Sequence, residues 1–116
     1  MIAHVVLFTP RRNLPPAERS ELARSFERAL RDIPSLRRAH VGRRSLHGAG
    51  YEAAAPDYSH AAILEFDDHA GLQAYLQHSA HSEPAQRFFA AAEATQILDY
   101  EMVEGSGVSD AAVGWL

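Results

Sequence analysis

The sequence predicts an α+β fold in which four strands and two helical regions alternate in the order β-α-β-β-α-β. Stretches of β-branched and aromatic residues predict the strands, and the regions between them carry apolar residues at helical spacing. Such a split order is typical of the ferredoxin-like sandwich, whose helices cover one face of the sheet. The length of 116 residues fits one domain of this kind.

The first half of the chain predicts a strand, a helix and a second strand. Residues 2–9, IAHVVLFT, are β-branched and aromatic, and Pro10 closes this strand. Residues 13–34 predict a helix, because paired prolines suit its entry and Pro34 ends it. Residues 36–46, LRRAHVGRRSL, form the second predicted strand. The apolar stripe of the helix consists of Leu22, Phe26, Ala29, Leu30 and Ile33.

The second half begins with a connection rich in glycine and alanine. Residues 47–57 have this composition, so we expect a mobile loop there. Residues 58–66, YSHAAILEF, predict the third strand. A helical pattern follows over residues 69–79, with Asp67 or Asp68 as its N-cap.

The helical region before the last strand is expected to consist of two pieces. We expect the break at Ser79 and Ala80, after which Ser82 offers a new N-cap. Residues 95–103, TQILDYEMV, predict the last strand. We therefore expect a domain over residues 1–103.

The first and last predicted strands of the chain are apolar on both faces. Residues 2–9 alternate apolar side chains onto both sides of the first strand. In the last strand one face carries Leu98, Tyr100 and Met102, and the other carries Ile97 and Val103. Because the helices cover only one face, the other face needs a different cover. We expect a homodimer in which two copies pack sheet to sheet and form a dimeric α/β barrel.

Composition excludes several classes of function. The chain has 11 basic and 15 acidic residues with no basic run, so nucleic acid is not an expected partner. It has no cysteine, which excludes a disulfide scaffold, a cysteine nucleophile and a thiolate metal site. The apolar run near the start is too short to span a membrane and lacks the basic segment of a secretory signal. We expect a cytoplasmic protein with no membrane partner.

The stretch AYLQHSAHSEP, residues 74–84, is rich in side chains that form hydrogen bonds and titrate near neutral pH. Tyr75, His78 and His81 stand three residues apart from one another. We assign His78 to the last turn of the helix, where the helix dipole favours a cation. His78 and His81 also have a spacing that two metal ligands could use. Two ligands do not make a site, so we expect no metal and no cofactor.

Several motifs resemble the stress-responsive dimeric α/β-barrel family, called Dabb. They are IAHVVLF, IPSLRRAHVG, YSHAAILEFDDHAGLQAYLQHSAH and LDYE. The resemblance covers roughly residues 1–103, and it departs from the family at Ser79, where proline is frequent. It implies the ferredoxin-like fold, a homodimer, and a pocket between the sheet and the helices.

The resemblance also implies a site. Olivetolic acid cyclase, a plant enzyme of this fold, closes a linear poly-β-keto thioester by intramolecular aldol condensation. Its site is similar in pattern to His4, His60, Tyr75 and His81. By this resemblance His81 and Tyr75 are the catalytic residues, with His81 as general base and Tyr75 holding the developing enolate oxygen. His4 and His60 would bind the substrate or orient His81.

Other roles for these residues stay open from the sequence. His81 could cap a helix break, Tyr75 could be a core residue, and His4 could be a satisfied histidine of a half-buried strand. The alternative functions are a non-catalytic dimeric domain that binds a small apolar ligand and a cofactor-free monooxygenase. A pocket sealed from solvent, with His81 and Tyr75 within hydrogen-bond reach of one volume, would favour the enzyme. A collapsed pocket filled by Phe88 or Phe89 would favour the binding domain.

Residues 104–116 form a predicted tail after the domain. The link Glu104–Gly107 has a flexible composition, yet the tip carries Val113, Trp115 and Leu116. Because a disordered tail gains nothing from a large indole, we expect Trp115 to dock against the dimer.

Overall fold

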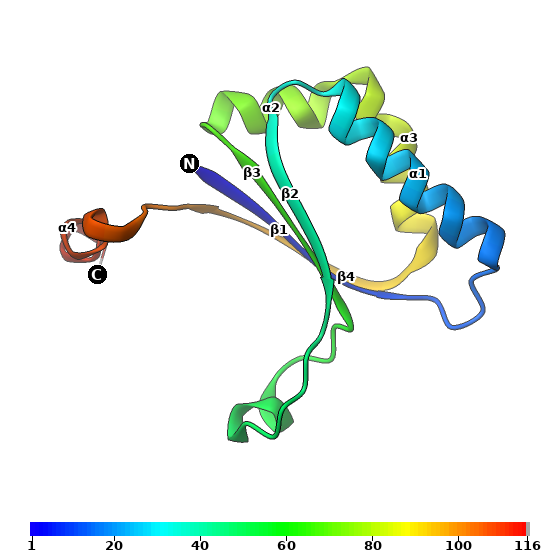
Figure 1. Cartoon of the computed structure of the whole chain (residues 1–116), viewed down its shortest axis with the longest axis horizontal. Helices are drawn as coiled ribbons and strands as arrows, with labels where there is room; N and C mark the ends of the chain where they lie inside the picture. The colour runs from blue at the N-terminus through cyan, green and yellow to red at the C-terminus, as the bar shows by residue number, and fades with distance from the viewer. Residues whose placement is uncertain (116) are drawn as a thin grey trace.

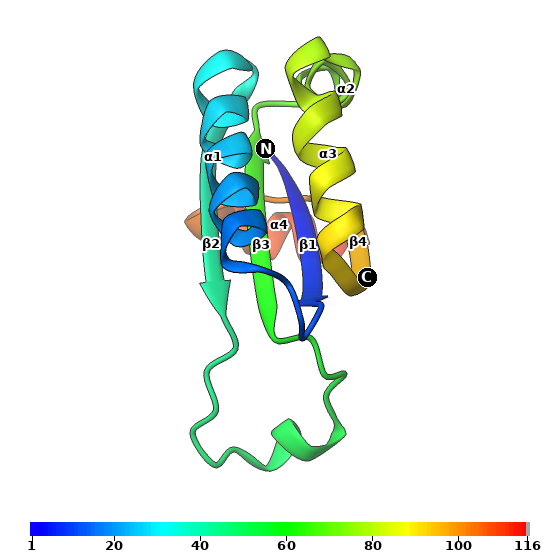
Figure 2. The same ribbon diagram turned by 90° about the vertical axis from the view of Figure 1, so that its right-hand side faces the viewer.

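The computed structural model describes residues 1–115 and confirms the ferredoxin-like α+β fold. Its elements in chain order are β1 (Ile2–Pro10), α1 (Pro16–Asp32), β2 (Leu36–Arg43), η1 (Gly50–Ala54), β3 (His60–Phe66), α2 (His69–Gln77), α3 (Ser79–Ala91), β4 (Ala92–Glu101), η2 (Gly105–Gly107) and α4 (Val108–Trp115). Figure 1 shows α1, α2 and α3 gathered on one side of the sheet. Figure 2 shows α1 and α3 side by side over that face.

The sheet has the strand order β2-β3-β1-β4, and all neighbouring strands are antiparallel. The central strand β1 places His4 opposite Leu64 on β3 and opposite Asp99 on β4. Side chains directly opposite each other in an antiparallel pair point to the same face. The register therefore places the side chains of these three residues on one face of the sheet.

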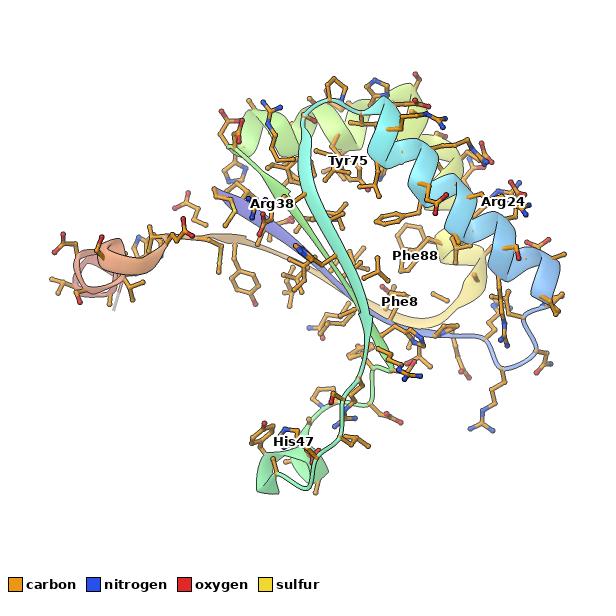
Figure 3. All side chains as sticks on the ribbon, in the orientation of Figure 1. Phe8, Arg24, Arg38, His47, Tyr75 and Phe88 are labelled. Atoms are coloured by element: carbon orange, nitrogen blue, oxygen red, sulfur yellow. The ribbon has the colours of Figure 1, made fainter. Side chains whose placement is uncertain are left out.

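The hydrophobic core lies between the sheet and the helices. Phe66 and Leu64 of β3 and Ile33 after α1 are fully buried, and each contributes roughly 1.5–3 kcal/mol by leaving water. Tyr75 of α2 belongs to this core, with its ring centroid 5.1 Å from that of Phe66. Figure 3 shows Phe8, Phe88 and Tyr75 pointing into the space between the layers, while Arg24 points outward from α1.

Ion pairs connect α1 to α3 on the outer surface. Arg28 of α1 donates to Glu83 of α3 at 2.9 Å, and Arg87 of α3 lies 4.0 Å from Glu18 of α1. Exposed pairs of this kind contribute about 0–1 kcal/mol each. Apolar packing against the sheet, and not these pairs, therefore holds the two helices in place.

The connection between β2 and β3 is longer than the sequence predicts. β2 ends at Arg43 instead of Leu46, and β3 begins at His60 instead of Tyr58. Part of the connection forms the short 3₁₀ helix η1. The carboxylate of Glu52 stabilises it by accepting backbone N–H groups at 2.7 and 3.0 Å.

The last strand lies earlier in the chain than predicted. β4 begins at Ala92 and ends at Glu101, whereas the prediction ran from Thr95 to Val103. The physical reason is the length of β1, because its last residue, Pro10, still pairs with Ala92 across a bulge.

The helical region breaks at His78, and the predicted break at Ser79 and Ala80 is wrong. His78 has an extended backbone (φ −66°, ψ 139°) and separates α2 from α3. Its Nδ1 accepts the N–H of Ala80 at 3.0 Å, so His78 caps α3 and Ser82 lies inside the helix. The imidazole of His78 therefore serves as the N-cap of α3, whereas the sequence assigned it to the last turn of the preceding helix. Asp68 caps α2 as predicted, accepting a backbone N–H at 2.8 Å.

The face of the sheet opposite the helices is open. It carries the half-buried Val5 and Leu7 of β1 and the exposed Ile63, Leu98 and Tyr100 of β3 and β4. We call these five side chains the open face. The connection between β2 and β3 and the tail helix α4 both project on this side of the sheet (Figure 1). Among residues 1–115, no helix has the length and apolar character needed to cross a bilayer.

Candidate functional site

A cavity of about 390 Å³ lies between the sheet and the helices. This volume is within the range of about 300–1,000 Å³ that is typical of small-molecule sites. It is lined by side chains from all four strands and from the helices α1, α2 and α3. Phe88 and Phe89 of α3 belong to its walls and do not fill it.

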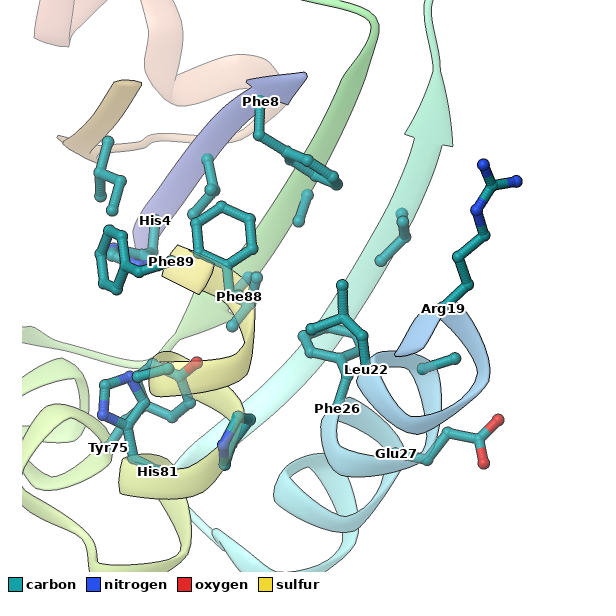
Figure 4. A pocket seen from close by; sticks show the side chains of 18 residues that line it. His4, Phe8, Arg19, Leu22, Phe26, Glu27, Tyr75, His81, Phe88 and Phe89 are labelled. Carbon is teal, nitrogen blue, oxygen red and sulfur yellow. The ribbon is translucent and has the colours of Figure 1, made fainter. Parts of the chain in front are cut away.

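Three polar residues named by the sequence meet at one end of this cavity. His4 comes from β1, Tyr75 from α2 and His81 from α3 (Figure 4). The ring centroids of Tyr75 and His81 are 4.6 Å apart, and those of Tyr75 and His4 are 6.1 Å apart. The tyrosine ring therefore lies close to both imidazoles, and both contacts are edge-to-face.

Asp99 of β4 extends this group. Its Oδ1 lies 2.5 Å from Nδ1 of His4, whose side chain is only 8% exposed. A carboxylate only accepts hydrogen bonds, so Nδ1 of His4 carries the hydrogen and the tautomer of the ring is fixed. Asp99 itself is 41% exposed at the edge strand. It therefore orients a buried imidazole from a position that water still reaches.

The environment shifts the acid–base properties of the other two residues in opposite directions. Burial raises the pKa of Tyr75 to about 12, so its hydroxyl keeps its proton at all ordinary pH values. The pKa of His81 is lowered from 6.5, first by burial and then by the charge of His4 when protonated, while the Leu76 carbonyl acts weakly in the other direction. At neutral pH the site thus combines a hydrogen-bond donor with an unprotonated base.

The remaining walls of the cavity are mostly apolar. Phe8, Phe26 and Phe88 line its middle, and the exposed Val41 and Ile97 line it at the two edge strands. The cavity therefore opens toward the edges of the sheet.

Two charged residues lie at the other end of the cavity. They are Arg19 and Glu27, both on α1, and Figure 4 shows them away from Tyr75 and His81. A polar end, an apolar middle and a charged rim suit a molecule that is apolar along most of its length.

His60 does not belong to the residues that line the cavity. It stacks on Phe8 with the ring centroids 5.4 Å apart, and its Nδ1 lies 2.8 Å from the hydroxyl of Ser59. The strand alternation does place His60 toward the helices, but the Phe8 ring lies against it. The structure thus brings together three of the four histidine and tyrosine residues that the resemblance implied.

Sequence reasoning missed Asp99. Its signal was the two-residue period of β4, which places Asp99 on the same face as Ile97 and hence on the face toward the helices. The missing information was the register, because only the pairing of β1 with β4 sets Asp99 opposite His4. Among residues 1–115, no three His, Cys, Asp or Glu side chains are grouped as metal ligands.

Comparisons with known proteins place this geometry in context. The fold is similar to a hydroxynitrile lyase from Passiflora edulis, at 20% identity and a TM-score of 0.76, covering 90% of this chain and 94% of that chain. It is also similar to a dimeric protein of unknown function and ferredoxin-like fold from Bacteroides fragilis, at 25% identity and a TM-score of 0.61, covering 87% and 95%. A third similar structure is SnoaB, a cofactor-independent oxygenase from Streptomyces nogalater, at 19% identity and a TM-score of 0.66, covering 90% and 95%.

The comparison with curated proteins gives no match. The family model matches over nearly the whole length of the ordered domain. It spans residues 2–102, which include all four strands and the cavity. The chain is a member of the Dabb family, the Stress responsive A/B Barrel Domain.

Proposed function

We propose that this chain forms a homodimer that binds a small, largely apolar carbonyl compound and removes a proton next to its carbonyl group. The observation that carries this proposal is the meeting of His4, Tyr75 and His81 at one end of an apolar cavity. A buried donor beside an unprotonated base is the pair that enolate formation needs.

The proposed chemistry uses two residues directly. An imidazole nitrogen of His81 takes the proton from the carbon α to the carbonyl, and the electron pair of that C–H bond moves to form the enolate. The hydroxyl of Tyr75 donates a hydrogen bond to the enolate oxygen, which carries the developing negative charge. The enolate carbon then either regains a proton or attacks a second carbonyl of the same molecule, which would close a ring.

His4 acts in this proposal as a positioning residue. Its ring is held by Asp99 and packs edge-on against Tyr75, so it limits the orientations of the phenol. Burial lowers the pKa of His81, and a positive charge on His4 would act in the same direction. His60 stays a candidate only as support for Phe8.

The substrate class follows from the walls. The aromatic rings of Phe8, Phe26 and Phe88 favour an aromatic or alkyl body, and the carbonyl would lie at the end near Tyr75. A linear or cyclic polyketide-like ketone has this distribution of polar and apolar groups.

The proposed dimer forms through the open face. Val5, Leu7, Ile63, Leu98 and Tyr100 would expose a contiguous apolar surface in a monomer, which soluble proteins tend to cover. The dimeric ferredoxin-like protein from Bacteroides fragilis offers a precedent for such a state in this fold.

Deuterium exchange tests the chemistry without knowledge of the natural substrate. The probe is 2-tetralone, an aromatic ketone with acidic α-hydrogens, incubated with the protein in D₂O and followed by NMR. We expect catalysed α-exchange by the native chain and loss of this exchange in His81→Ala and Tyr75→Phe. Binding of 2-tetralone is measured separately by calorimetry.

The two measurements separate the candidate functions. Binding together with exchange that depends on His81 supports the enzyme. Binding with no exchange above the buffer rate replaces the enzyme with a domain that only binds small apolar ligands. Exchange that persists in His81→Ala refutes the role of His81 as the base.

A further inference from the structure

The tail helix α4 lies apart from the hydrophobic core of the domain (Figure 1). The backbone leaves β4 where Met102 N–H donates to the Met1 carbonyl at 2.9 Å, which fixes the direction of the chain. Gly105 then adopts φ +55°, a left-handed conformation that glycine tolerates, and the chain turns into η2 and α4. The tail is thus placed by backbone structure, although the family model ends at residue 102.

One side of α4 is apolar. Val108, Ala111, Ala112 and Trp115 follow i, i+3, i+4 and i+7, the spacing of a single helical stripe. Val108 is 51% exposed and Trp115 is 59% exposed. An isolated helix of eight residues is marginal in water, and an exposed indole adds nothing to its stability. The stripe therefore has the properties of a surface that packs against another molecule.

The position of α4 indicates what that molecule is. Figures 1 and 2 both place α4 on the side of the sheet opposite α1 and α3, next to the open face. A second copy that covers the open face of one chain lies directly beside its tail helix.

We propose that the apolar stripe of α4 packs against the second copy of this chain, with Trp115 as its anchor. This inference rests on the dimer of the proposed function and adds a contact outside the domain that the family model covers. Each chain would contact its partner through the open face and through its own tail. We call this contact of the two tails with their partner chains the clasp.

The fluorescence of the native chain tests the proposal directly, because Trp115 is the only tryptophan. Acrylamide quenching is measured over a dilution series, with sedimentation velocity on the same samples. We expect Trp115 to be shielded in the dimer and to become accessible as the dimer dissociates. Shielding that is equal in monomer and dimer would mean that the tail packs on its own chain, which overturns the proposal.

A matched pair of full-length variants gives the second measurement. Trp115→Ala removes the anchor, whereas Val113→Ala changes a residue that lies off the stripe and is 85% exposed. We expect the first variant to weaken the dimer at least about tenfold and the second by less than about twofold. For a dimer too tight to dilute, both values come from the concentration dependence of urea unfolding.

The outcomes distinguish the tail from the dimer itself. A native chain that sediments as a monomer overturns the proposed dimer and the clasp together. A dimer in which Trp115 is quenched as freely as a tryptophan amide, or in which both variants behave like the native chain, overturns only the clasp.

Discussion

His78 and His81 stand three residues apart, and the structure predicts opposite consequences for their replacement. His78 caps α3 by accepting the N–H of Ala80 at 3.0 Å, and it lies outside the residues that line the cavity. Loss of an N-cap acceptor costs about 1 kcal/mol, within a range of roughly 0.5–2 kcal/mol. For a domain of this size, that corresponds to a fall in Tm of about 4 °C. His78→Asn, which restores a capping oxygen, is expected to recover most of this loss.

His81→Ala acts on reactivity instead. A positioned general base contributes about 10²–10⁴-fold to a proton transfer, which is roughly 3–5 kcal/mol of barrier. His81 is only partly buried and packs against Tyr75 at one edge, so its loss leaves the core of the fold intact. We expect α-exchange of 2-tetralone to fall by at least about 10²-fold, with a change in Tm smaller than that of His78→Ala.

The assays are thermal unfolding by circular dichroism and α-exchange by NMR, at one protein concentration because dimer formation affects Tm. The matched outcome is a stability loss without an exchange loss in His78→Ala, and the reverse in His81→Ala. Equal exchange losses in the two variants would refute the assignment of His81 as base. A His78→Ala variant as stable as the native chain would refute the capping role.

Five other predictions concern the same site and surfaces. The exchange rate is expected to decline at acid pH with a midpoint below pH 6.5, because the pKa of His81 is lowered from that value; a midpoint above pH 6.5 would contradict this. Exchange is expected to persist on the alkaline side up to the limit of stability, because the pKa of Tyr75 is raised to about 12. Tyr75→Phe is expected to lower exchange by about 10²–10³-fold while keeping the ring contacts, and an unchanged rate would remove Tyr75 from the chemistry. Asp99→Asn is expected to slow exchange, and Glu101→Gln, two residues along the same strand, serves as the control that leaves exchange unchanged. Leu98→Asp is expected to give a monomer by sedimentation.

Much of the fold follows from local patterns in this chain. The β-branched and aromatic run of residues 2–9 and the apolar stripe of α1 identify their elements directly. The sequence identifies Asp67 or Asp68 as the cap because a short carboxylate stands just before an apolar run, and the structure selects Asp68. The end of a strand is harder to predict, because it depends on the length of its neighbour. β4 starts at Ala92 only because Pro10 is there to pair with it.

The candidate site likewise contains residues that local patterns predict and residues that depend on long-range packing. Tyr75 and His81 follow from their motif, whereas the contact between His4 and Asp99 spans 95 residues and depends on strand register. His60 lies on the expected strand, but the neighbouring Phe8 ring lies against it, and the packing of one side chain on another has no signature in a one-dimensional pattern. The sequence predicts Ser82 as the N-cap of the second helical piece, because serine is a commoner capping residue than histidine, whereas His78 caps α3 in the structure.

The extended residue at His78 also sets the rotational phase between α2 and α3. Tyr75 and His81 are six residues apart, and in an uninterrupted helix six residues turn through about 600°, which leaves the two side chains about 120° apart around the axis. On one straight helix they would therefore lie on different sides of the axis. Resetting the helix at a single residue brings their ring centroids to 4.6 Å. Adding or removing one residue between them would rotate α3 by about 100° and carry the imidazole out of the cavity, so the number of residues at this junction is as much a part of the site as their identity.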